Sequence, residues 1–219
     1  MELTRPPAPD APAAPSVAFN RTLQLRTEDY EAVATTKNLI VLHFTAGQSA
    51  RSAYDTWRAD PRRIATAYVV DRDGMIYEMF DPRYWAWHLG IKGGVAHDKR
   101  SIGIEIANVG PLTASADGSS LNWWVGKPFC RIDEQDKYCA KEYRGYQYYA
   151  AFPRPQITAV GELVRYLVER FSVPKVLTAA NRRHDYDESF FASFKGIATH
   201  ANFRKDKFDI GPAFDWDAL

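Results

Sequence analysis

The stretch Leu39-Ile-Val-Leu-His43-Phe-Thr45 decides the fold of this 219-residue chain. Its continuous apolar run is typical of a central strand whose two faces are both buried. The run leads to His43, and a lone histidine at such a place is more often a buried core residue than a metal ligand. The stretch therefore predicts a buried β-sheet, and the role of His43 depends on what other segments bring to it.

A second segment, His200-Ala-Asn-Phe-Arg-Lys-Asp-Lys207-Phe-Asp209, lies near the C-terminus. Two imidazoles and a carboxylate are the ligand types of a catalytic zinc site that keeps one open position. Bound zinc lowers the pKa of water to about 7, which provides a nucleophile at neutral pH. Lys207 and Asp209 are two residues apart, so in an extended segment both side chains point the same way. Taken alone, Asp209 would be a solvated charge in a run of lysines and aspartates.

A third segment, Ser101-Ile-Gly-Ile-Glu105-Ile-Ala-Asn108, alternates isoleucines with small or polar residues. This period of two predicts a strand with one buried face. The other face carries Glu105 between the small residues Gly103 and Ala107, which leaves room for another group to approach the carboxylate. A structural salt bridge is the alternative role for Glu105.

These segments stand in order with three others: Tyr68-Val-Val-Asp-Arg-Asp-Gly74, Ala86-Trp-His88-Leu-Gly90, and the closing Ile210-Gly-Pro with Phe214-Asp-Trp216. The order resembles that of the zinc-dependent N-acetylmuramoyl-L-alanine amidases of type 2, relatives of the peptidoglycan recognition proteins. The resemblance covers roughly residues 37–110 and 155–216. It implies an α/β fold with a central mixed β-sheet flanked by helices, and the interleaved helical and strand periodicities favour the same class.

The resemblance implies a zinc site with one ion per chain. His43 and His200 match the two histidine ligands, and Asp209 matches the carboxylate ligand. Glu105 matches the acidic residue that handles protons at the zinc-bound water, and Lys207 matches the lysine that stabilises the developing oxyanion.

Two further residues match the substrate side of the family's groove. Trp87 and His88 correspond to a pair that lines this groove, so His88 is expected to face substrate and not to bind the metal. Some relatives use a tyrosine on the strand before Asp71 as the acid or base. Here that strand reads Ala65-Thr-Ala-Tyr68, with no tyrosine at the matching place, which favours Glu105 for this role.

The implied reaction is hydrolysis of the amide bond between N-acetylmuramic acid and the L-alanine of the stem peptide, with peptidoglycan or muropeptides as substrate. Two alternatives stay open: a peptidoglycan-binding module without catalysis, and a zinc hydrolase of another amide or peptide bond. The chain keeps all three expected ligands, which disfavours a pure binding module.

Composition sets limits on these expectations. The net charge is +1 and no long basic run occurs, which argues against nucleic acid as the main partner. With 46% hydrophobic residues the chain can bury one core, so a single catalytic domain is expected over residues 21–219. Residues 1–20 are rich in proline and alanine and are expected to form a disordered leader or linker. The sequence has no segment typical of a signal peptide or a transmembrane span.

Cys130 and Cys139 are separated by eight residues of mostly polar sequence. Such spacing is typical of a small loop closed by a disulfide, and two unrelated thiols are the alternative. A disulfide would favour an oxidising compartment. We expect a monomer in the cell envelope (periplasm) or secreted from the cell, with the cytoplasm as the alternative location.

Periodicity and turn residues predict the remaining elements. Helices are expected over 49–59 and around 157–171, a hairpin at 65–80 about the turn 71–74, and short strands at 176–179 and 196–200. An aromatic-rich insertion is expected near 111–155, with a polar loop at 115–120, and a second insertion at 181–195. Most of the aromatic side chains in the first insertion are expected to pack it against the body, although some could offer faces to sugar rings or a peptide stem. His97 and His184 are expected to be surface residues.

Overall fold

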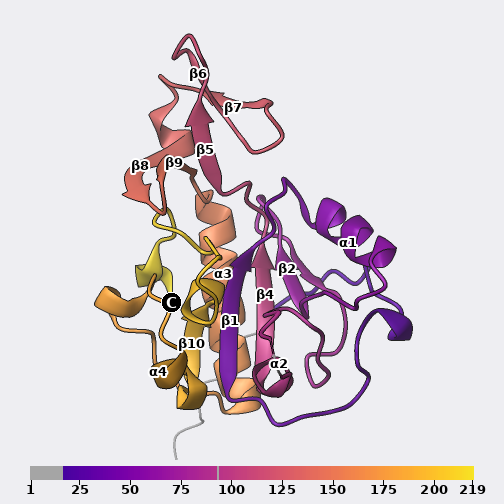
Figure 1. Ribbon diagram of the computed structural model, residues 1–219. Helices are drawn as coiled ribbons and strands as arrows, with labels where there is room; N and C mark the ends of the chain where they lie inside the picture. The colour runs from indigo at the N-terminus through magenta and orange to yellow at the C-terminus, as the bar shows by residue number, and fades with distance from the viewer. Residues whose placement is uncertain (1–16, 93) are drawn as a thin grey trace, which may run out of the picture.

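The computed structural model describes residues 17–92 and 94–219 (Figure 1). A mixed five-stranded sheet lies at the centre, in the order β10-β1-β4-β2-β3. Strands β10, β1, β4 and β2 run parallel, and β3 is antiparallel to β2 at one edge. The strands are β1 (Leu39–Phe44), β2 (Tyr68–Val70), β3 (Ile76–Glu78), β4 (Ser101–Ile106) and β10 (Gly196–Thr199). The predicted α/β fold with a central mixed sheet is confirmed.

Strand β1 is buried on both faces, as its apolar run predicted. Leu42 belongs to the main core together with the long helix α3 (Arg154–Phe171), which lies behind the sheet in Figure 1. Val41 belongs to a smaller cluster with Leu89 and Phe203 on the other face. His43 follows the same alternation as Val41, so its side chain lies on this second face.

The two long helices predicted from the sequence are confirmed. Helix α1 (Ala50–Ala59) begins after Ser49, whose hydroxyl accepts a hydrogen bond from the amide of Ser52. Helix α3 ends before Ser172, which adopts the left-handed conformation with φ 52°. Among the described helices, none is both long and apolar enough to cross a membrane. The shorter helices are α2 (Ala96–Arg100), α4 (Glu188–Ser193), and the 3-10 helices η1 (Thr27–Asp29), η2 (Gln135–Lys137), η3 (Ala180–Arg182), η4 (His200–Asn202) and η5 (Trp216–Ala218).

Several of the shorter strands differ from the predicted ones in length or in the residue at which they end. The hairpin about residues 71–74 forms, although β2 and β3 are each only three residues long. The strand expected at 176–179 is wrong, because only Leu177 bridges to Ile197 and the chain then turns into η3. Strand β10 ends at Thr199, one residue earlier than predicted, since the side chain of Asn202 accepts the amide hydrogen bond of Thr199 at 2.9 Å and begins η4.

Residues 111–150 form a second, antiparallel sheet, which we call the inserted sheet, in the order β7-β6-β5-β9-β8. Its strands are β5 (Pro111–Ala114), β6 (Ser120–Asn122), β7 (Pro128–Arg131), β8 (Tyr138–Tyr143) and β9 (Tyr146–Ala150). In Figure 1, β5, β6 and β7 project beyond the central sheet. The inserted sheet has a small core of its own: Val109, Leu112, Leu121, Cys130 and Ala150. The sequence predicted an insertion here without predicting a sheet, and the expected polar loop at 115–120 is largely the β5–β6 turn.

The predicted disulfide between Cys130 and Cys139 is wrong. Both thiols are free, with Cys130 buried on β7 and Cys139 half-buried on β8. These two strands form opposite edges of the inserted sheet, with β6, β5 and β9 between them. Neighbouring strands lie about 4.8 Å apart, whereas a disulfide tolerates a Cα separation of no more than about 7 Å. Closeness in sequence therefore did not bring the two thiols together.

The leader predicted at residues 1–20 is only partly covered by the structure, and residues 1–16 lie outside the described residues. Residues 17–20 join the packed body. The ring of Phe19 contacts those of Tyr68 and Tyr166, and the backbone of Asn20 forms hydrogen bonds with Ile76 and Glu78 on β3.

Candidate metal centre

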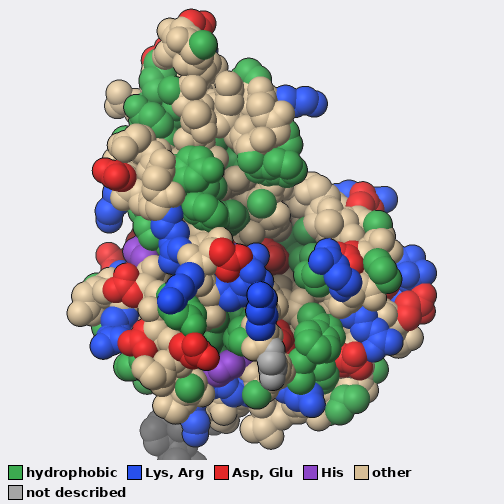
Figure 2. All heavy atoms as spheres, viewed as in Figure 1, with side chains coloured by type: hydrophobic (Ala, Val, Ile, Leu, Met, Phe, Trp, Pro, Cys, Tyr) green, Lys and Arg blue, Asp and Glu red, His purple; other side chains and the backbone are tan. Residues whose placement is uncertain are grey.

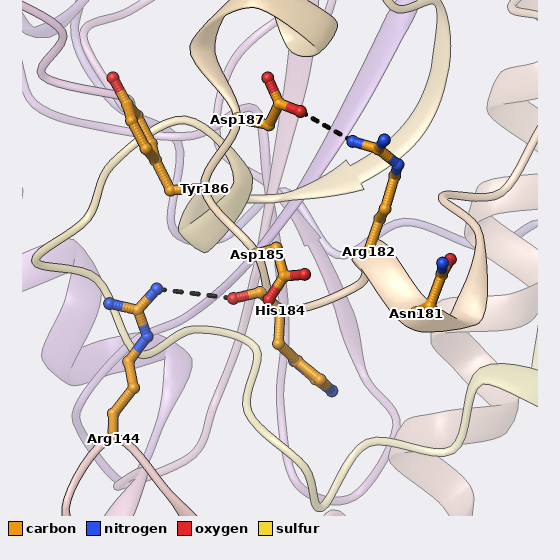
Figure 3. A pocket seen from close by; sticks show the side chains of 7 residues that line it. All are labelled: Arg144, Asn181, Arg182, His184, Asp185, Tyr186 and Asp187. Carbon is orange, nitrogen blue, oxygen red and sulfur yellow. Dashed lines mark hydrogen bonds and ion pairs between the residues drawn. The ribbon is translucent and has the colours of Figure 1, made fainter.

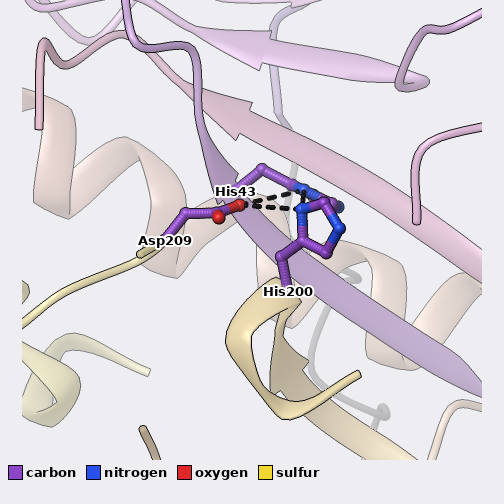
Figure 4. A group of neighbouring side chains, drawn as sticks. All are labelled: His43, His200 and Asp209. Atoms are coloured by element: carbon purple, nitrogen blue, oxygen red, sulfur yellow. Dashed lines mark hydrogen bonds and ion pairs between the residues drawn. The ribbon is translucent and has the colours of Figure 1, made fainter. Parts of the chain in front are cut away.

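Three predicted ligands meet at the C-terminal ends of neighbouring parallel strands (Figure 4). His43 comes from β1, His200 from the first residue of η4 directly after β10, and Asp209 from the loop that follows. The Nδ1 atoms of the two histidines are 3.0 Å apart. Oδ2 of Asp209 lies 3.1 Å from Nδ1 of His200 and 3.2 Å from Nδ1 of His43. All three side chains are buried.

This triangle of donor atoms fits a zinc ion. Zinc binds histidine nitrogen and carboxylate oxygen at about 2.0–2.2 Å, so donors at the corners of a tetrahedron lie about 3.3 Å apart. The observed separations of 3.0–3.2 Å are close to that value. Three protein donors would occupy one face of the tetrahedron and leave the fourth corner for water or substrate, which is the arrangement of catalytic zinc sites.

The protonation states of the donors suit a metal. Burial, together with the charge of His200, lowers the pKa of His43 to about 4, so the His43 imidazole is neutral at pH 7. Burial alone would raise the pKa of Asp209. The positive charge on protonated His200 outweighs burial when no metal is bound and holds that pKa well below its usual range. A neutral imidazole and a carboxylate are the forms that bind metal ions.

A hydrogen bond from Nε2, the ring nitrogen that faces away from the other two candidate ligands, orients the His200 side chain. Nε2 of His200 lies 2.9 Å from the carbonyl oxygen of Leu89. A carbonyl can only accept, so Nε2 carries the proton and Nδ1 keeps a free lone pair toward the other ligands. The amides of His88 and Leu89 both donate to the buried carboxylate of Asp98, at 3.0 and 2.9 Å, which fixes the backbone that holds His200.

A relay of three groups fixes His43 in the same way. The hydroxyl of Ser101 donates to the carbonyl of His97 at 2.7 Å, so it accepts from Nε2 of His88 at 2.8 Å. His88 is then unprotonated at Nδ1, where it accepts from Nε2 of His43 at 2.9 Å. Nδ1 of His43 is therefore free for a metal, and His88 orients this candidate ligand as well as lining the neighbouring cavity.

Gly103 makes room for this relay on strand β4. A Cβ atom at position 103 would lie 2.7 Å from Cγ2 of Thr66 and 3.2 Å from Cγ of His88. Both contacts are tighter than side chains normally allow, so a larger residue would push the His88 ring away from His43. Gly103, the small residue two positions before Glu105, thus leaves space for His88, which the sequence pattern did not specify.

Glu105 shares the face of the sheet that carries His43, because the two residues are register partners on parallel strands β4 and β1. Its Oε2 atom is buried and has no hydrogen-bond partner among the described residues. Burial raises the pKa of Glu105 well above its usual range, the charge of Asp209 adds to this rise, and Lys207 opposes it. Within residues 17–92 and 94–219 Glu105 forms no ion pair, so the structural salt bridge is not observed.

Tyr68 does not replace Glu105 as an acid. It pairs in register with Ile104, so it lies on the opposite face of the sheet from Glu105. Its hydroxyl donates to the carboxylate of Glu78 at 3.4 Å, and burial raises its pKa above its ordinary value.

A cavity of about 260 Å³ opens beside the metal ligands and brings the predicted substrate residues together. Trp87, 38% exposed, lies in its wall with His88 and Lys207. The cavity is basic, since its lining contains three cationic side chains and no carboxylate of the described residues. Its lining residues are Arg62, Ile64, Trp87, His88, Leu89, Gly90, His200, Arg204 and Lys207.

The sequence pattern of the N-acetylmuramoyl-L-alanine amidase family matches residues 34–211. The chain belongs to this family. A comparison with curated proteins finds no match.

Two solved structures share the fold of this chain. A complex of the N-acetylmuramyl-L-alanine amidase AmiD from E. coli with anhydro-N-acetylmuramic acid-L-Ala-D-γ-Glu-L-Lys is 22% identical, with a TM-score of 0.54 over 85% of this chain and 57% of AmiD. The chain thus spans little more than half the length of AmiD. PlyL is 13% identical, with a TM-score of 0.50 over 88% of this chain and 86% of PlyL.

A second polar hollow of this amidase-family chain, about 430 Å³ in volume, is separate from the metal ligands (Figure 3). Its side chains are largely paired with one another: Arg182 donates to Asp187 at 2.7 Å, and Arg144 donates to the carbonyls of His184 and Lys205. Arg144 lies in the β8–β9 turn, so it ties the inserted sheet to the loop that carries Asp209. No sequence pattern singled out Arg144, because its partners are backbone atoms far along the chain.

The two remaining histidines are half-buried and are not free surface residues as predicted. The Nδ1 atom of His97 accepts hydrogen bonds from Arg100, and its ring lies 5.2 Å from that of Phe203. The ring of His184 lies 5.1 Å from that of Tyr143. Neither joins the ligand cluster. Ser101, at the start of β4, takes part in the relay to His43, a contact that no sequence pattern predicted.

Proposed function

We propose that the protein is a zinc-dependent N-acetylmuramoyl-L-alanine amidase. It would hydrolyse the amide bond between N-acetylmuramic acid and the L-alanine of the stem peptide, in peptidoglycan or muropeptides. The observation that carries this proposal is the triangle of His43, His200 and Asp209 donors with Glu105 on the same face of the sheet, in a chain of the amidase family. The muropeptide bound to AmiD supports the substrate class.

His43, His200 and Asp209 would hold one zinc ion per chain. Zinc at this place supplies a Lewis acid that polarises a carbonyl and lowers the pKa of water to about 7. Glu105 accepts the proton of the attacking water and returns it to the departing amine of L-alanine, so that no net proton is gained or lost at the residue. Its raised pKa suits the acid step, and the nearby charge of Lys207 keeps the base form accessible.

Lys207 and the pair Trp87 and His88 complete the proposed site. The ammonium of Lys207 would stabilise negative charge on the carbonyl oxygen as the tetrahedral intermediate develops. Trp87 would face the substrate across the basic cavity, whose cations suit the carboxylates of a stem peptide. We propose that the protein acts in the cell envelope or outside the cell, where the wall polymer is found. We also propose that it acts as a monomer.

Product analysis tests the reaction. Purified peptidoglycan is incubated with the protein, and the soluble products are identified by mass spectrometry. We expect intact stem peptides with a free L-alanine amine, together with glycan that has lost its peptides. Peptides cut at an internal bond would indicate a zinc hydrolase of another specificity, and binding without products would indicate a recognition module.

Metal analysis tests the ligands independently of the reaction. Zinc content measured by mass spectrometry should be close to one ion per chain in the wild type and should fall sharply in His43→Ala and Asp209→Asn. Asp206→Asn is the matched control, because Asp206 lies on the same loop but is 63% exposed and pairs with Arg204. Chelation should abolish turnover and added zinc should restore it. Full activity of a metal-free preparation would contradict the zinc mechanism.

A further inference from the structure

An exposed tryptophan stands at the end of the strand that carries His43. Trp124 lies in the β6–β7 turn of the inserted sheet and is 71% exposed. Its indole nitrogen donates to the carbonyl of Ala46 at 2.7 Å. Ala46 is three residues beyond His43, so the hydrogen bond fixes the indole near the ligand-bearing end of β1 while a face of the ring stays in solvent. A large aromatic face that is held in place and left open to solvent is typical of a binding surface.

A groove of about 520 Å³ runs between this turn and helix α1. One wall is aromatic, with the rings of Trp123 and Trp124 5.8 Å apart and nearly perpendicular at 81°. The other wall is helix α1 with its exposed residues Ser52 and Thr56, whose hydroxyls donate to the backbone carbonyls of Ser49 and Ser52 and keep their acceptor lone pairs. Figure 2 shows hydrophobic side chains where the projecting part of the molecule meets the body. The lining residues are Thr45, Ala46, Gly47, Gln48, Ser49, Ser52, Ala53, Thr56, Trp57, Trp123 and Trp124.

The charge of the groove separates it from the cavity beside the metal ligands. Among the described residues that line the groove none is charged, whereas Arg62, Arg204 and Lys207 line the cavity. A stem peptide carries carboxylates and suits the basic cavity. An N-acetylhexosamine of the glycan is uncharged, has a C–H face that packs on an aromatic ring, and has hydroxyl and amide groups that pair with serine, threonine and glutamine. The neutral groove therefore suits sugar.

We propose that the groove between Trp123–Trp124 and helix α1 is a glycan subsite that binds an N-acetylhexosamine next to the muramic acid whose amide is cleaved. This inference rests on the proposed amidase function. Thr45, which lines the groove, is two residues from His43, so one glycan strand can reach both sites, since a strand rises about 3.3 Å per residue. The protein would then favour polymeric peptidoglycan over isolated muropeptides, because only the polymer supplies the neighbouring sugar.

A soluble glycan tests the subsite without any amidase reaction. The probe is the β-1,4-linked tetramer of N-acetylglucosamine, which contains no muramyl amide, and its dissociation constant is measured by calorimetry on the whole protein. Trp124→Ala should weaken binding about tenfold or more, as truncation of a central aromatic contact typically does. Thr56→Arg, which fills the groove from the exposed face of α1, should weaken it similarly. Phe190→Ala is the matched control, since Phe190 is also an exposed aromatic residue, at 40%, but lies on α4.

Turnover on two substrates separates this proposal from the amidase function. Trp124→Ala should lose about tenfold more kcat/KM on polymeric peptidoglycan than on a monomeric muramyl peptide. The proposal is overturned if the tetramer does not bind the wild type, or if it binds Trp124→Ala and Thr56→Arg as tightly as the wild type. It is also overturned if the groove instead holds a second copy of the chain, seen as a dimer that Trp124→Ala dissociates. The proposed amidase function fails only if stem peptide is not released, and that result is independent of tetramer binding.

Discussion

Glu105 is buried in a way that supports its proposed role as the acid and base of the reaction. Its carboxylate lies beside the metal ligands without a partner for Oε2 in the described structure, which would be costly for a purely structural residue. We predict that Glu105→Gln, which keeps the shape and removes the base, lowers kcat by about 10²–10⁴-fold. Zinc content and melting temperature should stay close to the wild type. Glu78→Gln on β3, remote from the ligands, is the control, and wild-type turnover of Glu105→Gln would make Glu105 structural.

Ser101 is linked to His43 by two hydrogen bonds through the ring of His88, and we expect these bonds to set the protonation of His43. Without the Ser101 hydroxyl, Nε2 of His88 loses its acceptor, and the direction of the hydrogen bond to His43 is no longer fixed. We predict that Ser101→Ala lowers zinc affinity about tenfold, at the lower end of the 10–100-fold effects of groups that orient metal ligands. Competition with a chelator measures the affinity, and Ser120→Ala in the inserted sheet serves as control. An unchanged affinity would mean that Asp98 and the backbone alone hold His88.

Lys37 makes the stability of the protein depend on pH. Its ammonium is buried, donates to the carbonyls of Tyr84 and Lys99, and has a pKa lowered to about 7, mainly by burial. In the unfolded chain the pKa is about 10.4. Between these values the unfolded chain holds the extra proton, so the free energy of unfolding decreases as the pH falls from about 10 to about 7, by up to about 1.4 kcal/mol per pH unit.

The prediction for Lys37 is tested by urea denaturation at pH 7.5, 8.0 and 8.5. The free energy of unfolding should rise with pH in the wild type and in the exposed control Lys99→Met. It should rise much less in Lys37→Met, which has no ammonium to titrate. Equal slopes in all three proteins would show that Lys37 keeps its charge in the folded state.

At the scale of elements, the β8–β9 hairpin of the inserted sheet packs against the loop that carries the candidate ligand Asp209. The β8–β9 hairpin contacts the loop that carries Lys207 and Asp209, with the ring of Tyr146 5.7 Å from that of Phe208. Gly211, with φ 74°, lies against Tyr149, where a Cβ atom would come within 3.2 Å of the ring. The hairpin thus restricts the loop that carries Asp209, although none of its residues belongs to the cluster of His43, His200 and Asp209.

Strand order in the inserted sheet determines the chemistry of its cysteines. Because Cys130 and Cys139 lie on opposite edge strands, we predict two free thiols per chain in protein purified without reductant and counted after denaturation. Cys139, which is half-buried, should react with a thiol reagent before Cys130, which is 5% exposed. Reductant should leave the melting temperature unchanged. A mass two hydrogens lower than the reduced chain would show that a bridge forms.

At the scale of the whole molecule, the separate hydrophobic clusters of the central sheet and of the inserted sheet predict two levels of stability. The main core joins α3 to the central sheet, and the inserted sheet has its own smaller cluster. Leu163→Ala should lower global stability by about 2–5 kcal/mol, as large-to-small changes in a core do. Leu121→Ala should mainly speed amide hydrogen exchange within residues 111–150, because small units open before the global unfolding event. Equal acceleration in β1 and β4 would show that the two cores unfold together.

The sequence alone determined the features that depend on local periodicity. The apolar run of β1, the alternation of β4 and the stripes of α1 and α3 each follow from which residues neighbour one another on a strand or helix. The same order of motifs placed His43, His200 and Asp209 as a ligand set, and the structure brings these three together. His43 and His200 come together because β1 and β10 are parallel neighbours in the sheet, so that their carboxyl ends lie at one edge.

Only the tertiary structure decided which distant groups share a space. The relay from Ser101 through His88 to His43, the free state of Cys130 and the groove beside Trp124 all depend on strand order and on loops that approach from far along the chain. Local patterns carry no information on such pairings, because the free energy that selects them comes from burial and hydrogen bonds between segments that are remote in sequence.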